Sequence, residues 1–413
     1  MRALAERFIV LGVSGGIAAY KAAEVVRLLR KARAKVQVVM TEAAQRFVCP
    51  LTFEALSERP VLSDMFDLGN EAQMGHIRLA ESADLLLIAP ATADLIARMA
   101  AGMADDLLAA VALVTRAPML LAPAMNVHMW EHPITQANVE RLRMTRRLHV
   151  VGPGQGELAC GDVGRGRMAE PEEIVTAAAA LLEKKDLEGV RVLVTAGPTY
   201  EPIDPVRYLG NRSSGRMGYA LAAAAAARGA ATVLVSGPTS LHPPRGVHVE
   251  CVETAVEMAR AVQSHCDEES VDVVVMCAAV ADFRPKEQAS SKVKKEDVGS
   301  EWQLGLVRNP DILAVLGERK RAAGKGPLLV GFAAETDRVV EEGMRKLASK
   351  GCDLVVANQV GVEGQGFGAE ANKVIVIGPH GRVEEIPLLP KEEVAHRIWD
   401  HIVGLLPCSR RGG

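Results

Sequence analysis

The chain has 413 residues, 49% hydrophobic and 3% aromatic, with a formal net charge of −3. This length suffices for two or three domains, and the lack of basic excess or stacking aromatics argues against nucleic acid as a partner. No apolar run reaches the roughly 20 residues of a membrane span, and the first residues do not resemble a signal peptide, so no membrane partner and a cytoplasmic location are expected. The seven cysteines, an odd number without closely spaced pairs, argue against a disulfide framework and a zinc site.

Apolar runs alternate with helical segments along the whole chain. In the first half the predicted strands are residues 8–11, 35–40, 83–89, 118–122 and 149–151. The pattern restarts after a charged segment that ends at Gly189, and the predicted strands are then 191–195, 231–236, 271–277, 328–332, 353–357 and 373–377. This alternation predicts the α/β class, as two tandem doubly wound, Rossmann-like three-layer domains with parallel sheets, residues 1–186 and 187–413. A polar, lysine-rich run at 287–298 is predicted to be a mobile loop of the second domain.

The first predicted strand runs into a glycine-rich turn before a helix that starts at Ala18. Ser14, Gly15 and Gly16 in this turn suit a phosphate, because a hydroxyl and backbone amides meet at a helix start. The turn is not the dinucleotide pattern G-x-G-x-x-G, and the second strand ends at Thr41 without an acidic residue. The sequence therefore favours a mononucleotide such as FMN over NAD.

Two further turns follow the third and fourth strands. Thr92 lies after the third strand and is a candidate contact for a flavin ring or its ribityl chain, whereas nearby Asp94 fits a flavin contact or a helix cap equally well. The fourth strand leads into Pro-Ala-Met-Asn, which places Met125 and Asn126 where open α/β sheets bind ligands. These turns extend the predicted site along one sheet edge.

Two residues are candidates for moving protons. His76 precedes the third strand, and histidine titrates near neutral pH, although a lone histidine is more often a cap or core residue. Cys160 lies among the six glycines between Gly152 and Met168, a composition typical of a loop that closes over a substrate. A lone cysteine there is more often incidental, but the Asn126 motif favours a functional thiol.

The order of these motifs carries a family resemblance. The turn at 12–18, His76, the block at 123–126 and the Ala-Cys-Gly block at 159–161 resemble the homo-oligomeric flavin-containing cysteine decarboxylases, in particular the phosphopantothenoylcysteine decarboxylases. The second half resembles the phosphopantothenate–cysteine ligases through its motifs at 195–199, 204–208 and 211–215. The fused order is similar to that of the bacterial bifunctional coenzyme A biosynthesis proteins, over essentially the whole chain.

For the first half, a flavodoxin-like flavoprotein domain, the resemblance implies FMN-dependent decarboxylation of 4'-phosphopantothenoylcysteine to 4'-phosphopantetheine. The substrate carboxylate has no carbonyl placed to absorb the electrons that carbon dioxide leaves behind, so oxidation of the substrate thiol by the flavin must create that sink. By resemblance Cys160 is the acid, Met125 and Asn126 bind substrate, and His76 lies near the carboxylate. Trimeric contacts are implied as well, so Met129 and Trp130 fit either an interface or core packing.

For the second half, the resemblance implies that CTP, with Mg²⁺ bridging its phosphates, activates 4'-phosphopantothenate as an acyl-cytidylate that L-cysteine then attacks. Ser213, Ser214 and Gly215 would hold the substrate phosphate at a helix start. Asn211 would bind the acyl phosphate, and Arg207, from its own or the opposing subunit of a dimer, would offset charge. The resemblance assigns the nucleotide to Asp282, Lys292, Asn309, Pro310, Asp311, Ile312, Phe332, Lys346 and Lys350. No metal site made by protein side chains alone is expected.

The sequence departs from the family pattern at two positions, and two alternative functions remain open. Asp105 stands where the family commonly has asparagine at a flavin or substrate contact, and Arg216 stands where a lysine is common, which keeps the charge but changes the donor geometry. An NAD-dependent oxidoreductase would share the fold, but it needs the dinucleotide pattern G-x-G-x-x-G and an acidic residue for the ribose, and neither half has them. An FMN-binding regulatory protein is the other alternative, and the presence of both His76 and Cys160 argues against it.

Overall fold

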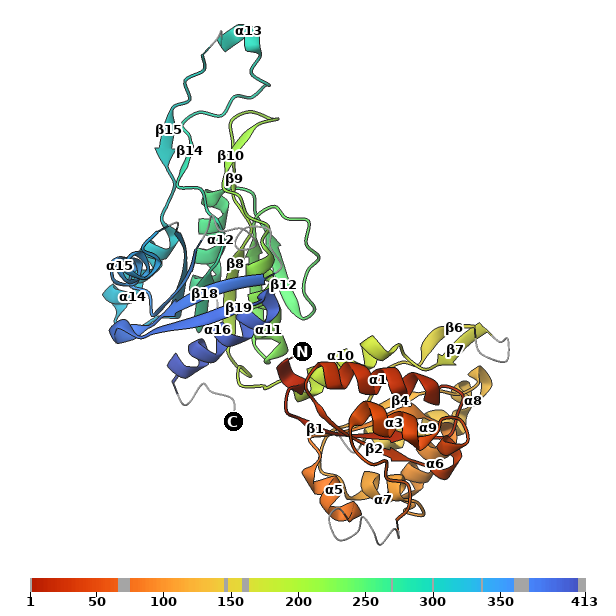
Figure 1. Ribbon diagram of the computed structural model, residues 1–413. Helices are drawn as coiled ribbons and strands as arrows, with labels where there is room; N and C mark the ends of the chain where they lie inside the picture. Colours follow the sequence, from red (N-terminus) through yellow and green to blue (C-terminus); the bar gives the residue numbers. More distant parts are fainter. Residues whose placement is uncertain are drawn as a thin grey trace. The chain divides into compact units, whose positions relative to one another are not determined.

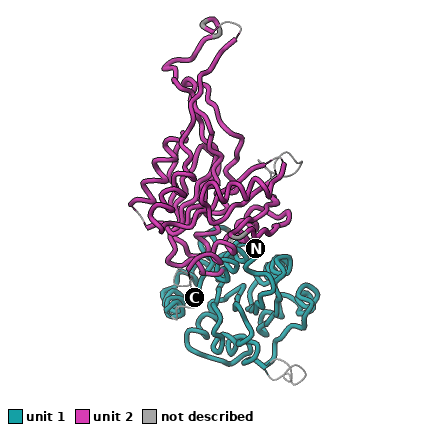
Figure 2. The backbone as a smooth tube through the Cα atoms, turned by 90° about the vertical axis from the view of Figure 1, so that its left-hand side faces the viewer, with its two compact units in different colours: residues 1–183 teal, residues 184–413 magenta. Residues whose placement is uncertain are grey.

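The computed structural model describes residues 2–65, 75–144, 148–157, 163–268, 270–298, 301–335, 337–359 and 371–407. The chain divides into two compact units, residues 1–183 and 184–413, which Figure 2 colours separately. Each unit has one large sheet with helices on both faces (Figure 1). The predicted class, two tandem doubly wound α/β domains, is confirmed. Within the described ranges, no helix combines the length and apolarity needed to cross a membrane.

The sheet of the first unit consists of five parallel strands. In spatial order they are β2 (Lys35–Met40), β1 (Phe8–Val13), β3 (Leu85–Ala91), β4 (Met119–Pro123) and β5 (Leu148–Val150). The four longer strands are almost entirely buried, as expected of a parallel sheet covered on both faces. The order 2-1-3-4-5 is the flavodoxin-like one, in which the winding reverses between β1 and β3.

Helices cover both faces of this sheet. One face carries α1 (Ala19–Lys31), α3 (Pro50–Ser57) and α10 (Pro171–Leu182), and the other carries α5 (His76–Ser82), α6 (Ala93–Ala101), α7 (Leu107–Val114) and α9 (Pro133–Arg143). The sequence of α1 explains why this helix packs on the sheet, because its buried positions 22, 25, 26 and 29 form one apolar stripe. The smaller elements are η1 (Arg2–Leu4), α2 (Glu42–Gln45), α8 (Val127–Glu131), and the antiparallel strands β6 (Gly154–Glu157) and β7 (Val163–Arg167).

The sheet of the second unit has eight strands. In spatial order they are β12 (Val247–Cys251), β11 (Ala231–Ser236), β8 (Arg191–Ala196), β13 (Val273–Met276), β16 (Leu328–Glu335), β17 (Leu354–Gln359), β18 (Ala371–Ile377) and β19 (Val383–Pro390). The first six are parallel and follow the Rossmann order 3-2-1-4-5-6. The winding therefore reverses between β8 and β13.

The last two strands differ from the predicted all-parallel arrangement. β18, which contains the predicted strand 373–377, pairs antiparallel with β17 and with β19. Only the short η2 (Pro379–Gly381) and its flanking residues separate β18 from β19, and this connection is too short for the crossover that a parallel pair needs. β12 and β19 were not predicted, because polar residues or proline interrupt their apolar residues, and β19 is also largely exposed.

Helices α11 (Arg216–Ala227) and α16 (Lys391–Leu405) pack together on one face of this sheet. Trp399 of α16 is fully buried and donates its indole N–H to the carbonyl of Leu221 at 2.9 Å. The other face carries α12 (Ala255–Glu268), α14 (Ile312–Ala323) and α15 (Val339–Lys350). The two helices on one face and the three on the other thus cover separate parts of the core.

Two arms extend from the second unit, beyond the large sheet (Figure 1). The first contains the antiparallel pair β9 (Tyr200–Pro202) and β10 (Tyr208–Gly210), and the second contains β14 (Phe283–Pro285) and β15 (Leu306–Arg308). Beyond β14 lies the short α13 (Lys295–Val298). The run 287–298 contains no strand among its residues, as predicted, and its mobility stays a prediction.

Candidate active sites

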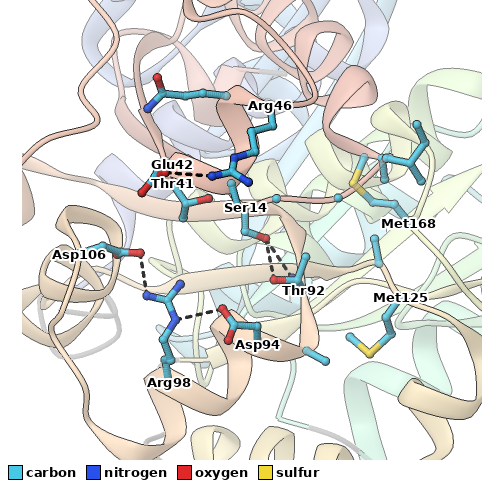
Figure 3. Close-up of a pocket in the computed structure, with 18 of the residues that line it drawn as sticks. Ser14, Thr41, Glu42, Arg46, Thr92, Asp94, Arg98, Asp106, Met125 and Met168 are labelled. Carbon is cyan, nitrogen blue, oxygen red and sulfur yellow. Dashed lines mark hydrogen bonds and ion pairs between the residues drawn. The ribbon is translucent and has the colours of Figure 1, made fainter.

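A cavity of about 1660 Å³ lies at the carboxyl ends of the first sheet. Its walls include Ser14 after β1, Thr41 after β2 and Thr92 after β3 (Figure 3). Asn126 after β4 also lines it. It spans the β1/β3 position where the winding reverses, and open α/β sheets bind their ligands at such positions. The cavity is therefore the candidate site of the first unit.

Hydroxyl groups hold the turns that form this cavity. The buried Ser14 hydroxyl donates to the carbonyl of Pro90 at 2.8 Å and accepts from the backbone N–H of Thr92 at 3.0 Å, which joins the turns after β1 and β3. Thr92 also caps α6, and Thr41 caps α2 through the backbone N–H of Ala44. These short polar side chains fix the loops without filling the space between them.

Two glycines are required because backbone segments approach closely. A Cβ on Gly15 would lie 2.4 Å from the Cβ of Ala43, and a Cβ on Gly166 would lie 2.4 Å from the carbonyl oxygen of Met125. Gly166 in β7 also accepts a hydrogen bond from the backbone N–H of Met125 at 3.0 Å. Bare backbone therefore lines the cavity at both places, where it can approach a ligand.

A cluster of charges forms one wall of the cavity. Arg98 binds Asp94 at 3.1 Å, Asp105 at 3.1 Å and Asp106 at 2.7 Å, and Figure 3 shows its guanidinium between Asp94 and Asp106. Burial opposes the charge of Arg98, but the three carboxylates outweigh it and raise its pKa. Asp105, the residue that departs from the family pattern, thus serves as a partner of Arg98. The sequence interpretation missed Arg98, although its i,i+4 spacing from Asp94 was a signal.

A second ion pair joins α1 to the segment after β7. The amine of Lys21 contacts both carboxylate oxygens of Glu170 at 2.9 Å, and Glu170 itself begins α10 in a capping box. The hydrogen bond from Lys21 is the main cause that lowers the pKa of Glu170. Sequence reasoning also missed this pair, because its members lie far apart in the chain.

The structure brings most of the predicted residues of the first site together. The cavity is lined by Ser14, Gly15, Gly16, Thr41, Thr92, Met125 and Asn126. His76 is not among its lining residues, because it begins the helix that leads into the amino end of β3, whereas the cavity lies at the carboxyl ends. Cys160 lies outside the described residues. Met129 lines the cavity, and Trp130 is buried in the core.

A smaller cavity, of about 460 Å³, lies at the carboxyl ends of the second sheet. Seven predicted residues line it, namely Asn211, Ser213, Ser214, Gly215, Asp282, Phe332 and Lys346. Gly215 has a φ of 73° immediately before α11, a conformation that suits glycine, and its N–H donates to the Ser213 hydroxyl at 3.2 Å. This turn directs the chain into α11 at the cavity wall.

Asparagine side chains connect the loops around the second cavity. Asn211 donates its side-chain amide to the carbonyl of Val280 at 2.9 Å, and Asn309 donates to the carbonyl of Ala281 at 2.8 Å. The backbone N–H of Asn309 also reaches the carbonyl of Asp282 at 2.9 Å. The predicted Asn-Pro-Asp-Ile turn, which includes Pro310 and Ile312, therefore lies directly against the turn after β13.

The two lysines of α15 have different surroundings. Lys346 lines the cavity and donates to the backbone carbonyl of Phe332, and burial is the main cause that lowers its pKa. Lys350 instead pairs with Asp311, the N-cap of α14. Burial would raise the pKa of Asp311, but its hydrogen bonds, first that from Lys350, lower it. Of the predicted pair, only Lys346 contacts the cavity in this arrangement.

Arg207 and Lys292 do not line the second cavity. They lie near each other on the two arms, where Arg207 contacts the residue next to Lys292. Sequence reasoning missed four polar residues that do line the cavity, Glu335, Asn358, Asn372 and Lys391. Lys391 is only 6% exposed, and burial first, then Arg216, lowers its pKa. A cation in the first turn of a helix, where the dipole disfavours it, was its only sequence signal.

Comparison with known proteins agrees with this two-site arrangement. Residues 2–183 match the sequence model of the Flavoprotein family, and residues 187–406 match that of the DNA/pantothenate metabolism flavoprotein C-terminal domain. The coenzyme A biosynthesis bifunctional protein CoaBC of Vibrio vulnificus is 48% identical over 406 residues, which cover 98% of this chain and 100% of that protein. The chain belongs to this family.

Other members of the family show the same extent of similarity. The CoaBC protein of Bacillus subtilis is 46% identical over 406 residues, 97% of this chain and 98% of that protein. A crystal structure of the C-terminal domain of a CoaBC protein covers 54% of this chain and 98% of its own, at 43% identity and a TM-score of 0.45. The predicted family and enzyme class are confirmed: this is a bifunctional coenzyme A biosynthesis enzyme that acts on pantothenate-derived substrates and cysteine.

Proposed function

We propose that residues 1–186 form an FMN-dependent 4'-phosphopantothenoylcysteine decarboxylase and residues 187–413 a CTP-dependent phosphopantothenate–cysteine ligase. The observation that carries the proposal is the presence of one cavity at the winding reversal of each sheet, each lined by the motifs of one activity. The ligase product is the decarboxylase substrate, so the two halves act in succession. The use of CTP and cysteine by the ligase half agrees with a cytoplasmic location.

The residues of the first cavity fit FMN. Gly15 and Gly16 leave the backbone bare ahead of α1, where amides and the Ser14 hydroxyl suit a single phosphate. Thr41 and Thr92 add hydroxyl groups that match a ribityl chain. Met125 and Met168 lie on one side of the cavity in Figure 3 and offer an apolar surface to a ring.

When bound, the flavin supplies reversible oxidation of the substrate thiol, which gives the carboxylate electrons a sink. The Oδ1 atom of Asn126 accepts from the backbone N–H of His128 at 2.8 Å, and we assign its amide group to the substrate carboxylate or amide. We assign the final protonation to Cys160. Because His76 does not reach the cavity of its own chain, we propose that it serves a neighbouring subunit through trimeric contacts.

In the ligase half, Ser213, Ser214 and Gly215 would hold the phosphate of 4'-phosphopantothenate, and Asn211 the acyl phosphate. We assign CTP, with its Mg²⁺, to Asp282, Phe332 and Lys346 at the cavity, to the adjoining residues Asn309, Pro310, Asp311, Ile312 and Lys350, and to Lys292 of the second arm. We propose a dimer formed through the arms, since exposed apolar side chains gather there, namely Val206, Tyr208, Phe283, Trp302 and Leu306.

Two measurements on the purified protein test the proposal. A flavin absorbance spectrum is expected, together with carbon dioxide release from 4'-phosphopantothenoylcysteine. With 4'-phosphopantothenate and Mg·CTP, pyrophosphate should form before cysteine is added, and CMP should follow after it. A flavin spectrum without carbon dioxide release would support the regulatory alternative instead. Pyrophosphate formation that depends strictly on cysteine would contradict the acyl-cytidylate.

A further inference from the structure

The turn between β9 and β10 contains a carboxylate with an unusually complete set of donors. Asp204 is 2% exposed, and its Oδ1 accepts from the backbone N–H groups of Val206 and Arg207, both at 2.8 Å. Its Oδ2 accepts from the Arg207 side chain at 3.0 and 2.6 Å. Burial alone would raise the pKa of Asp204, but these hydrogen bonds outweigh it and hold the pKa well below its usual range.

Asp204 and Arg207 also bind the second arm, which contains β14 and β15. The backbone N–H of Val293 donates to Oδ2 of Asp204 at 3.2 Å, and the Val293 carbonyl accepts from the Arg207 guanidinium at 2.6 Å. Both polar groups of one peptide residue are therefore bound by a single ion pair. The same guanidinium lies 4.7 Å from the ring centroid of Trp302, in the segment of that arm that precedes β15.

Further contacts fix the first arm, which carries Asp204 and Arg207, in place. The rings of Tyr200 and Tyr208 stack at 3.8 Å between centroids, and the buried Glu201 accepts from the backbone N–H of Ala255 at 2.9 Å. The backbone N–H of Ala289 donates to the carbonyl of Ile203 at 3.0 Å, a second link between the arms. The Asp204–Arg207 pair that binds Val293 is therefore anchored, through the first arm, to the rest of the second unit.

Lys292 precedes Val293 and is itself exposed. Asn211 follows β10, at the end of the same arm that carries Asp204 and Arg207. Resting on the proposed function, we propose that Asp204 is a positioning residue: with Arg207 it fixes the Val293 peptide and so sets Lys292 relative to Asn211 for activation of the carboxylate by CTP. Asp204 acts through Lys292 and does not itself contact the substrate.

Two readouts test this role in the full-length enzyme. Asp204→Ala should speed hydrogen exchange of the peptide 287–298 by about tenfold or more, because charged hydrogen bonds are lost. It should also slow cysteine-independent pyrophosphate release on the order of 10²-fold, as expected when a charged group is misplaced. Asp267→Ala, which removes the carboxylate of an exposed ion pair elsewhere in this unit, is the control and should change neither.

The decisive comparison is with Lys292→Gln. This variant should slow pyrophosphate release without changing exchange, and the double variant should be no slower than Lys292→Gln alone, since Asp204 acts only through that amine. A slow Lys292→Gln with a normal Asp204→Ala, or multiplying effects in the double variant, would overturn the positioning role. A normal rate in Lys292→Gln would instead overturn the proposed role of Lys292 together with this inference. Should Asp204→Ala not fold, Asp204→Asn, which keeps the shape but not the charge, gives the same test.

Discussion

The guanidinium of Arg228 binds the carboxylate of Asp186 through two hydrogen bonds, of 2.7 and 2.5 Å, although Arg228 is the C-cap of α11 and Asp186 lies at the start of the second unit. Arg228 is 2% exposed and also binds Asp400 in α16 at 3.0 Å. Leu187 is fully buried beside this pair. The residues around the predicted boundary at 186/187 therefore pack with the second unit.

This contact defines where the chain can be cut. We expect a cut between Glu183 and Lys184 to give two folded pieces, of which only the first is yellow. A second piece that begins at Val190 should unfold on the order of 3 kcal/mol more easily, because it leaves a buried arginine without one partner. Urea unfolding of both versions measures the difference. Equal stability, or an insoluble 184–413 piece, would show that this interpretation is wrong.

Two neighbouring glycines offer a matched test of the first cavity. Gly15→Ala should cost ~1–3 kcal/mol of stability and lower flavin retention, because the new Cβ would overlap Ala43. Gly16→Ala should change stability by no more than about 1 kcal/mol, since its Cβ would only touch Thr92 at 3.5 Å. Thermal unfolding of the apoprotein and the flavin-to-protein absorbance ratio check both. Equal losses in the two variants would count against the close packing at Gly15.

Cys160→Ser tests the proposed acid. Serine is a far weaker acid than cysteine, so flavin binding and thiol oxidation should continue while the final protonation fails. Mixing with 4'-phosphopantothenoylcysteine should bleach the flavin and leave an oxidised enethiol product. Cys49→Ser, at an exposed cysteine, is the control and should turn over normally. Normal turnover by Cys160→Ser would remove the thiol from the mechanism.

The ligase steps can be separated by two substitutions. Lys292→Gln should suppress pyrophosphate release, whereas Asn211→Asp should allow acyl-cytidylate to form and persist after cysteine is added. Loss of one such donor typically costs two to three orders of magnitude in rate, roughly 3 kcal/mol, which single-turnover assays resolve. The exposed Lys325→Gln, outside the cavity, serves as the control. Both variants stalling at the same step is the result that would refute the assignment.

Thiol chemistry should distinguish the partly buried Cys266, Cys277 and Cys352 from exposed cysteines. Burial raises the pKa of Cys277 to about 12 and those of Cys266 and Cys352 to about 11, so few thiolates exist at pH 8. Alkylation of these three should be at least about 100-fold slower than that of the exposed Cys251.

These pKa values also set a direction for stability. A thiol with a raised folded pKa stabilises the fold below its unfolded pKa of about 8.5, and that contribution is lost as the pH rises toward 11 or 12. The contribution of Cys277, taken as the difference in unfolding free energy between this protein and a Cys277→Ala variant, should therefore be smaller at pH 10.5 than at pH 8. Lys346 and Lys391, whose pKa values are lowered, change stability in the opposite direction and are common to both proteins. Rapid alkylation of Cys277 in the native protein at pH 8 would contradict the burial described for it.

Several features were predictable because they depend on local pattern. The continuous apolar runs indicated parallel strands, and Gly15, Thr41, Thr92 and Asn126 were placed at strand ends, which meet at one edge of a parallel sheet. β19 was not predictable in this way, because its exposed strand has no apolar run. Lys391 also escaped prediction, since nothing near it in the chain indicates a cavity.

The sequence by itself determined the strand succession, the motifs at the strand ends and the family, because each depends on residues within a short window or on their order. Only the tertiary structure decided the partners of single charges. Lys350 was expected to bind phosphate beside Lys346, and in this structure it pairs with Asp311. Arg207 was expected to offset charge near the acyl phosphate, and in this structure it binds Asp204 and Val293. A charge binds the opposite charge that folding brings within reach, and that distance is set by packing between segments far apart in the chain.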